Sequence, residues 1–110
     1  MNRVFKSVGK EPKSKTCDAM KGLIAEGEAV VHEIDESVLR DAGLIAAANR
    51  VEHYEMAAYG SARTFAEALG YQEAATELMA TLAEEKKADE TLTRIATTSV
   101  NQQALHAGAA

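Results

Sequence analysis

Few residues in this chain disturb a helix or supply a large core side chain. Its 110 residues include one proline, Pro12, and no tryptophan, and aromatic side chains make up only 5% of the sequence. Alanine and glutamate are abundant, and glycine is rare inside the long apolar-periodic segments. This composition predicts helix throughout and a core of aliphatic and alanine side chains. At most one domain fits in this length, so self-association is expected to bury additional apolar surface.

Cysteine and recognisable catalytic motifs are equally scarce. Cys17 is the only cysteine, which excludes a disulfide within the chain and is compatible with a reducing compartment. We interpret it as a structural residue, with a reactive thiol near a helix N-terminus as the alternative. The sequence contains no nucleophile–base arrangement, glycine-rich phosphate loop or CxxC pair, so hydrolytic and nucleotide-dependent chemistry have no support. It also has no signal-like segment and no apolar run of bilayer length, so a cytoplasmic protein without membrane contact is expected.

The charge pattern argues against nucleic acid as a partner. The net charge is −5, and the acidic residues are spread over the predicted helical faces. The segment from Lys6 to Lys21 has five lysines, but it also contains Glu11, Pro12 and Asp18. We interpret residues 1–15 as a solvated basic arm rather than a phosphate-binding patch.

Apolar residues at helical spacing predict three helices after this arm. The first is expected to start with Thr16 as its N-cap, and the second to close at Gly70. Only two or three residues join the second and third helices, so these should pack antiparallel as a long hairpin. A short tail, residues 99–110, is expected to fray. The predicted helices cover residues 16–34, 38–69 and 72–97.

Two carboxylate pairs interrupt the apolar stripes of this hairpin. Glu52 and Glu55 are three residues apart on one helix, and Glu85 and Asp89 are four apart on the next, so each pair shares a helix face. In an antiparallel hairpin that turns after Gly70, residues whose numbers sum to about 141 lie level, which places all four acids in one layer. Burying several carboxylates without neutralising them is very unfavourable. The four acids therefore predict half of a carboxylate-rich site for iron or manganese in a helical bundle.

A structural role for the acids is the alternative. In that case the wide helix face would be wet, or each acid would be held by a neighbouring cation. The candidate ion pairs are Glu52 with Arg50 or Arg63, and Glu85 with Lys86 or Lys87.

The histidines and tyrosines near the acids are not predicted to be ligands. His53 follows Glu52 but points about 100° away from it, which favours a supporting or surface role. His32 lies near a helix end, and His106 lies in the tail. Tyr59, seven residues after Glu52, is placed to hydrogen-bond a carboxylate, although packing more commonly explains such a residue.

Several segments of the chain resemble the YciF-type family of bacterial stress-associated proteins. The resemblance covers nearly the whole chain. It implies a ferritin-like, rubrerythrin-related helical bundle and an association with general and osmotic stress. The segments that carry it are KTCDAM (residues 15–20), RDAGLIAAA (40–48), VEHYE (51–55), AYG (58–60), ART (62–64) and EEK (84–86).

The resemblance also assigns roles to individual acids. Glu52 and Glu55 match the Glu-x-x-Glu of a third bundle helix, and Glu85 matches the glutamate of the fourth. The usual partner of that glutamate is a histidine three residues later, where this chain has Ala88, and Asp89 is the candidate substitute. This departure weakens any expectation of ordinary ferroxidase or oxidase activity, and it leaves open whether the chain is an enzyme.

Family members begin with two further helices, which carry the remaining ligands. Met1 to Lys10 resembles the end of the second of these helices and its connection, so the chain corresponds to the C-terminal two-thirds of the family. Half a bundle exposes a large apolar face, and a homodimer or higher homo-oligomer is expected to cover it.

These observations predict an all-α protein with a ferritin-like helical bundle: a long antiparallel hairpin and a preceding shorter helix, completed by dimerisation. Its predicted parts are a basic arm (1–15), a ferritin-like helical domain (16–98) and a tail (99–110). The predicted function is that of a stress-associated protein with a dinuclear iron or manganese site. The alternative is a metal-free helical structural or interaction protein that oligomerises through its apolar faces. The predicted metal ligands are Glu52, Glu55, Glu85 and Asp89.

Overall fold

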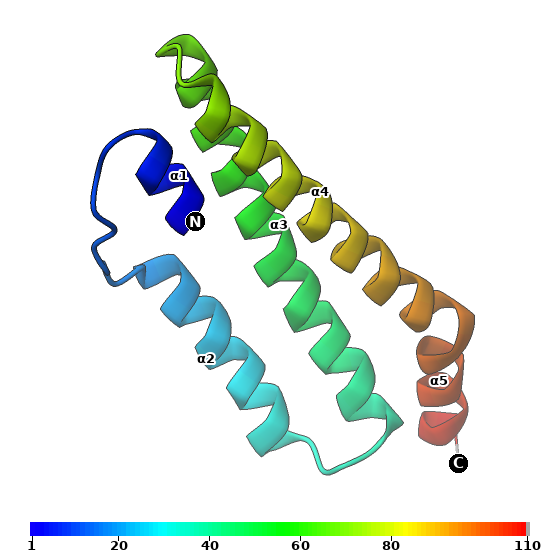
Figure 1. Ribbon diagram of the computed structural model, residues 1–110. Helices are drawn as coiled ribbons and strands as arrows, with labels where there is room; N and C mark the ends of the chain where they lie inside the picture. Colours follow the sequence, from blue (N-terminus) through cyan, green and yellow to red (C-terminus); the bar gives the residue numbers. More distant parts are fainter. Residues whose placement is uncertain (110) are drawn as a thin grey trace.

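The chain folds into helices, with a long loop between α1 and α2 and shorter connections between the later helices (Figure 1). The computed structural model describes residues 1–109, and no strand occurs in them, which confirms the predicted all-α class. Ala110 lies outside the described residues. The elements are α1 (Asn2–Ser7), α2 (Asp18–Glu33), α3 (Val38–Ala68), α4 (Gln72–Ile95), the π-helical segment η1 (Ala96–Val100) and α5 (Asn101–Ala109).

Helices α3 and α4 form the long antiparallel hairpin predicted from the sequence (Figure 1). Residues 69–71 connect them, and Gly70 has a φ of +79°. In this left-handed conformation, the Gly70 N–H donates to the Glu67 carbonyl oxygen at 3.1 Å and the Tyr71 N–H donates to that of Ala66 at 2.8 Å. The last carbonyls of α3 are thereby satisfied, so the turn ends the helix where the sequence predicts.

Two glycines of this hairpin should respond to the same substitution in opposite directions. Gly70→Ala is expected to lower the free energy of unfolding by roughly 1–2 kcal/mol, because a Cβ strains the left-handed backbone. Gly60→Ala is expected to raise it by roughly 0.5–1 kcal/mol, because Gly60 lies inside α3 with nothing within 4 Å of an added Cβ. Urea unfolding followed by circular dichroism would measure both. Equal effects of the two substitutions would contradict the assigned turn.

Helix α2 runs beside α3 and begins one residue later than predicted. Its N-cap is Cys17, not Thr16, because the Cys17 Sγ accepts a hydrogen bond from the Met20 N–H at 3.4 Å. The capping of α3 follows the sequence pattern, since the Ser37 Oγ accepts from the Arg40 N–H at 3.2 Å.

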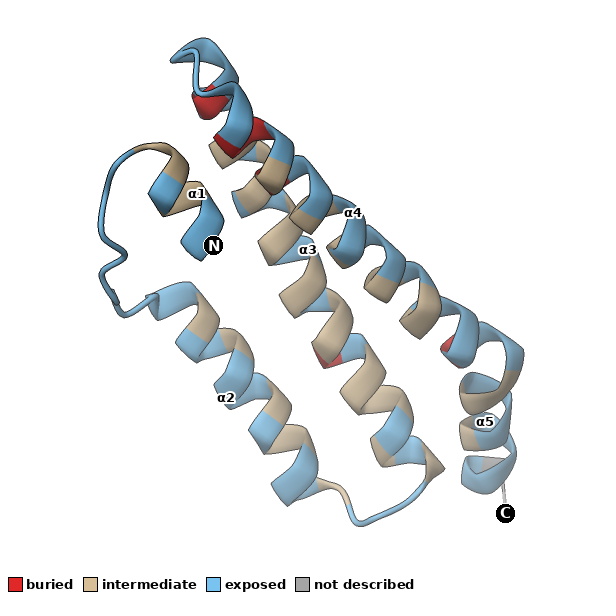
Figure 2. Cartoon of the chain, in the orientation of Figure 1, coloured by how far each residue is buried: buried red, intermediate tan, exposed pale blue. Residues whose placement is uncertain are grey.

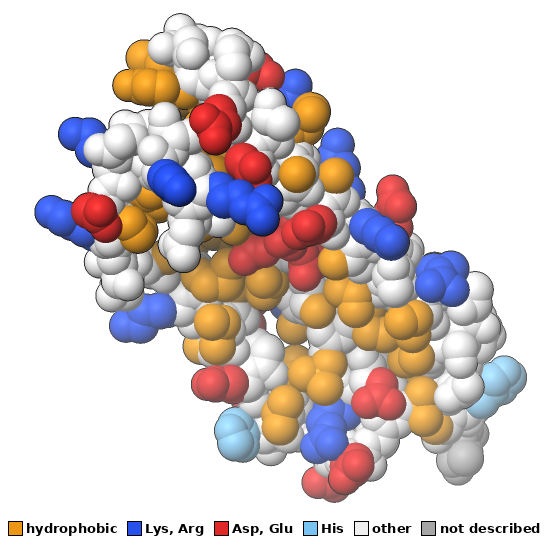
Figure 3. Space-filling view, viewed as in Figure 1, with side chains coloured by type: hydrophobic (Ala, Val, Ile, Leu, Met, Phe, Trp, Pro, Cys, Tyr) orange, Lys and Arg blue, Asp and Glu red, His pale blue; other side chains and the backbone are white. Residues whose placement is uncertain are grey.

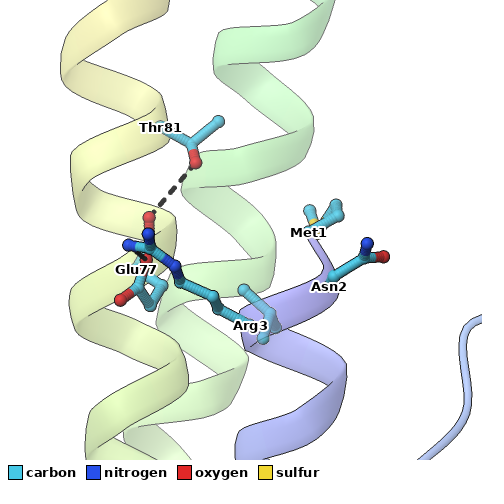
Figure 4. A pocket seen from close by; sticks show the side chains of 6 residues that line it. Met1, Asn2, Arg3, Glu77 and Thr81 are labelled. Carbon is cyan, nitrogen blue, oxygen red and sulfur yellow. Dashed lines mark hydrogen bonds and ion pairs between the residues drawn. The ribbon is translucent and has the colours of Figure 1, made fainter.

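The N-terminal segment does not form the solvated arm predicted for residues 1–15. Residues 2–7 form α1, which packs against α4, although residues 10–17 have no regular secondary structure. The apolar side chains of Val4 and Val8 lie against the core, and Arg3 reaches Glu77 of α4 with an N–O distance of 3.7 Å (Figure 4). The apolar face of α1 is therefore sufficient to hold this segment against α4, although the segment also carries solvent-exposed lysines. A helical end of this kind is what the YciF-type resemblance implies for Met1 to Lys10.

The C-terminal segment also differs from the prediction. Residues 101–109, expected to fray, form α5, which packs against α3 (Figure 1). No proline or glycine lies between residues 96 and 107, so nothing in the sequence ends the helix there. The π-helical segment η1 lies where the chain turns from α4 into α5.

The buried core is small and consists almost entirely of alanine (Figure 2). The principal-axis extents are 58 × 27 × 17 Å, so the molecule is elongated and thin. This shape leaves most side chains exposed or only partly covered. The buried hydrophobic residues within the described part of the chain are Ala47, Ala66, Ala74, Ala75, Leu78 and Ala96.

Candidate metal centre

Three of the four predicted ligands come together between α3 and α4. One carboxylate oxygen each from Glu52, Glu55 and Glu85 lies within 4.8 Å of the other two, and all three residues are half-buried. The Glu52 Oε2 atom is buried and has no hydrogen-bond partner among residues 1–109. Figure 3 shows acidic side chains gathered near the middle of one face, beside hydrophobic ones. We call Glu52, Glu55 and Glu85 the acid cluster.

Two acids of this cluster, Glu55 and Glu85, hold their protons more tightly than isolated glutamates, because their pKa values are raised. Burial raises the pKa of Glu55, and the hydrogen bond and charge of Glu85 raise it further. The pKa of Glu85 is raised chiefly by its hydrogen bond with Glu52 and then by burial. Both shifts have the same physical origin, since carboxylates close together in a partly dry site disfavour ionisation. A bound cation would relieve this repulsion.

The raised pKa of Glu55 predicts how the stability of the metal-free protein depends on pH. A carboxyl group whose pKa is higher in the folded state stabilises the fold fully below its ordinary value of 4.5, and this contribution is lost as the pH rises through the folded pKa. Glu55→Gln removes the charge, so the variant should gain stability over the wild type as the pH rises from 4.5 through the folded pKa of Glu55.

Urea unfolding in the presence of chelator, repeated across this pH range, would test the prediction. Glu90→Gln is the matched control, because Glu90 is an exposed glutamate on α4. A stability difference for Glu55→Gln that does not grow with pH would contradict the proposed repulsion.

Asp89, the fourth predicted ligand, has different partners. Its Oδ1 atom accepts a hydrogen bond from the Asn49 Nδ2 at 2.6 Å and lies 3.1 Å from the His53 Nε2. Asp89 is predicted as a fourth ligand beside the other three acids, but in the structure it contacts Asn49, a partner that the sequence pattern does not predict. The sequence does contain an indication of this contact, because Asn49 is a polar residue within an apolar stripe of α3.

The cations proposed as alternative partners of Glu52 bind other acids. Arg50 pairs with Glu26 at 3.3 Å, and Arg63 pairs with Glu67 at 2.9 Å. Within residues 1–109, no ion pair joins Glu85 to Lys86 or Lys87. Among the described residues, no Lys, Arg or His forms an ion pair with the acid cluster.

Two further residues near the site have structural partners. Tyr59 packs against the alanine-rich core, and burial followed by the charges of Glu55 and Glu85 raises its pKa. Cys17 is exposed, and its Sγ lies 3.1 Å from the hydroxyl of Tyr54. That hydrogen bond is the main reason why the pKa of Cys17 is lowered.

The amino-acid sequence identifies the family to which this chain belongs. Residues 1–105 match the family described as "Domain of unknown function (DUF892)". The chain belongs to this family. Protein YciF of Escherichia coli K12 is 50% identical over 92 residues, which are 84% of this chain and 55% of that protein.

Solved structures give the same result for the fold. The crystal structure of the E. coli stress protein YciF matches with a TM-score of 0.85 and 46% identity, covering 91% of this chain and 64% of the relative. YcfI from Rhodopseudomonas palustris matches with a TM-score of 0.80 and 39% identity, covering 84% of this chain and 59% of the relative. The chain thus spans between half and two-thirds of the length of these relatives. The YciF-type resemblance and the helical fold are confirmed. None of the described helices combines the length and the apolarity needed to cross a bilayer.

Proposed function

We propose that this chain is a stress-associated protein whose acid cluster holds a dinuclear transition-metal site, with iron favoured over manganese. The observation that supports this most directly is the convergence of three carboxylates within 4.8 Å, none of which forms an ion pair within residues 1–109. The unpartnered Glu52 Oε2 provides a lone pair that is already desolvated and available to a cation. The stress association comes from the likeness to the E. coli stress protein YciF.

The donor set fits such a site chemically. Glutamate oxygens are hard anionic ligands of the kind that iron and manganese bind in helical bundles, where carboxylates bridge two ions. Glu52 and Glu55 would contribute from α3 and Glu85 from α4, so the hairpin itself fixes their spacing. Because bound iron or manganese changes oxidation state, it would supply redox chemistry toward dioxygen or peroxide.

The chain's own residues prepare this site in two ways. The raised pKa of Glu55 and of Glu85 supports the proposal, because carboxylates that resist ionisation would be stabilised by positive charge from protons or from a metal. Asp89, held by Asn49 and His53 at the next turn of α4, adds a fourth negative charge beside the cluster. It would strengthen the attraction for a cation and could become a ligand after a change of rotamer.

Metal analysis of the purified protein tests the proposal. Protein prepared without chelator from iron-replete cells is expected to contain stoichiometric iron, measured by inductively coupled plasma mass spectrometry. Protein grown with manganese in excess should contain manganese instead. Neither metal at stoichiometric level, in protein that is correctly folded by circular dichroism, would refute the site.

A metal-free interaction protein is the second candidate function. The exposed apolar side chains favour it, since Phe65 and Leu69 are 66% and 71% exposed. Under this alternative the acid cluster would be protonated or wet, and mutation of its glutamates would leave the assembly unchanged.

A further inference from the structure

The chain turns from α4 into α5 without leaving the helical conformation. Ala96, the first residue of η1, has φ −60° and ψ −49°, and Asn101, which follows η1, has φ −61° and ψ −41°. Within this segment the hydrogen bonds span five residues, since the Asn101 N–H donates to the Ala96 carbonyl oxygen. Single π turns of this kind are rare inside helices and are frequent at functional sites. The bend between α4 and α5 therefore lies inside one continuous helix and needs no loop (Figure 1).

Two threonine side chains support this bend. The Thr97 hydroxyl donates to the Thr93 carbonyl oxygen at 2.9 Å, and the Thr98 hydroxyl donates to that of Arg94 at 2.6 Å. Hydroxyl bonds to the carbonyl four residues back favour bending of a helix. They are also compatible with a regular helix, because Thr91 makes the same bond inside α4. The side chains of η1 therefore suit both a bent and a straight backbone.

Little burial holds α5 in its docked position on α3. Among residues 101–108 only Ala104 is half-buried, and Leu105 is 66% exposed. Burial of apolar surface is the main term that holds one helix against another, so this contact is weak. A groove of about 330 Å³ remains between α5 and the start of α3, and the residues that line it are Leu39, Ala42, Asn101, Ala104 and Leu105.

The bent and the straight form thus exchange one small contribution for another. The bent form contains a π turn, and it gains the contact of α5 with α3. The straight form would lose this contact, and it would gain regular hydrogen bonds to the carbonyl four residues back. We propose that η1 is a hinge on which α5 moves between the docked position and a straight extension of α4, which uncovers Leu39 and Ala42 at the start of α3. This conformational device depends neither on the acid cluster nor on a metal.

The distance between two spin labels tests the hinge. Nitroxide labels would be attached to Asp41→Cys on α3 and His106→Cys on α5, in a Cys17→Ser background, because Cys17 is the only native cysteine. Both labelled positions are exposed, and neither lines the groove. In the straight form residue 106 lies about 16 Å beyond the end of α4. Double electron–electron resonance should therefore show a short and a distinct longer separation, the longer one in about a tenth of the molecules or more.

A second label pair and a deletion locate the motion at η1. Labels at Asp41→Cys and Glu90→Cys lie on the hairpin before the hinge, so they should give one separation. Deletion of Thr97 removes the additional residue of the π turn. The longer separation between labels at 41 and 106 should then predominate, while that between 41 and 90 stays unchanged.

A single short separation between labels at 41 and 106 in the chain with the complete turn would overturn the inference. A broad distribution without a distinct longer separation would overturn it equally, since it would show that α5 unfolds and does not swing as a helix. A Thr97 deletion that keeps the short separation would show that the π turn is not the hinge. If that variant loses its helical circular dichroism, the measurement on the complete turn decides alone.

Discussion

Glu85→Ala is expected to weaken ferrous iron binding by at least about 100-fold, since losing even an outer partner of a ligand typically costs 10–100-fold in metal affinity. Glu85 is the only member of the acid cluster on α4, and one of its carboxylate oxygens lies within 4.8 Å of an oxygen of Glu52 and of Glu55. Its removal leaves two acids on a single helix, which is too few for a dinuclear site. Anaerobic equilibrium dialysis against ferrous iron would measure the loss, and Glu52→Ala should behave in the same way.

Two other variants serve as controls for this iron-binding experiment. Glu90→Ala removes an exposed glutamate from the same helix and should bind iron as the wild type does. Asp89→Ala should lower the affinity for ferrous iron about tenfold. This loss is smaller than that of Glu85→Ala because Asp89 contacts Asn49 and His53 and does not belong to the cluster. Wild-type affinity in Glu85→Ala would show that the acids bind no metal at this position.

Leu78→Ala is expected to lower the free energy of unfolding by about 2–5 kcal/mol, as large-to-small substitutions in a packed core do. Leu78 is 3% exposed, and it is the only large residue among the buried residues of the described chain. It joins α4 to Ala66 of α3 and lies against Val4 and Val8 of the α1 segment. Because a small domain has only about 5–15 kcal/mol of stability, the variant should be partly unfolded at physiological temperature. Urea unfolding followed at 222 nm would measure the change.

Leu105→Ala is the control for this core substitution. Leu105 lies on α5 and is 66% exposed, so its truncation should change the free energy of unfolding by less than about 0.5 kcal/mol. A Leu78→Ala variant as stable as the Leu105→Ala variant would show that the buried alanines, rather than Leu78, hold the hairpin together.

The hairpin and the level of the acids could be read from the sequence because they depend on regular geometry. The stripes on α3 and α4 follow the helical period, and the short turn at Gly70 fixes their antiparallel register. Once the register is known, the heights of Glu55 and Glu85 follow. For this reason the sequence alone predicted that these acids would meet.

Other features depend on choices that the sequence pattern does not encode. Whether Asp89 turns toward Glu85 or toward Asn49 is decided by its rotamer and its neighbours across the helix interface. The pattern predicts a solvated arm in place of α1 because lysines accompany its two valines, and it predicts a frayed tail in place of α5 because small residues are frequent there. In both cases tertiary packing decided the structure of a short segment with weak local preference.

The three-residue connection between α3 and α4 has a consequence for how the protein folds. Closing so short a loop costs little chain entropy, and burying alanine freezes no side-chain rotamers. The hairpin is therefore expected to be the folding nucleus, with the first two helices docking later. Because the acid cluster lies entirely within the hairpin, its mutual repulsion opposes this first step, and cations present during synthesis would speed it.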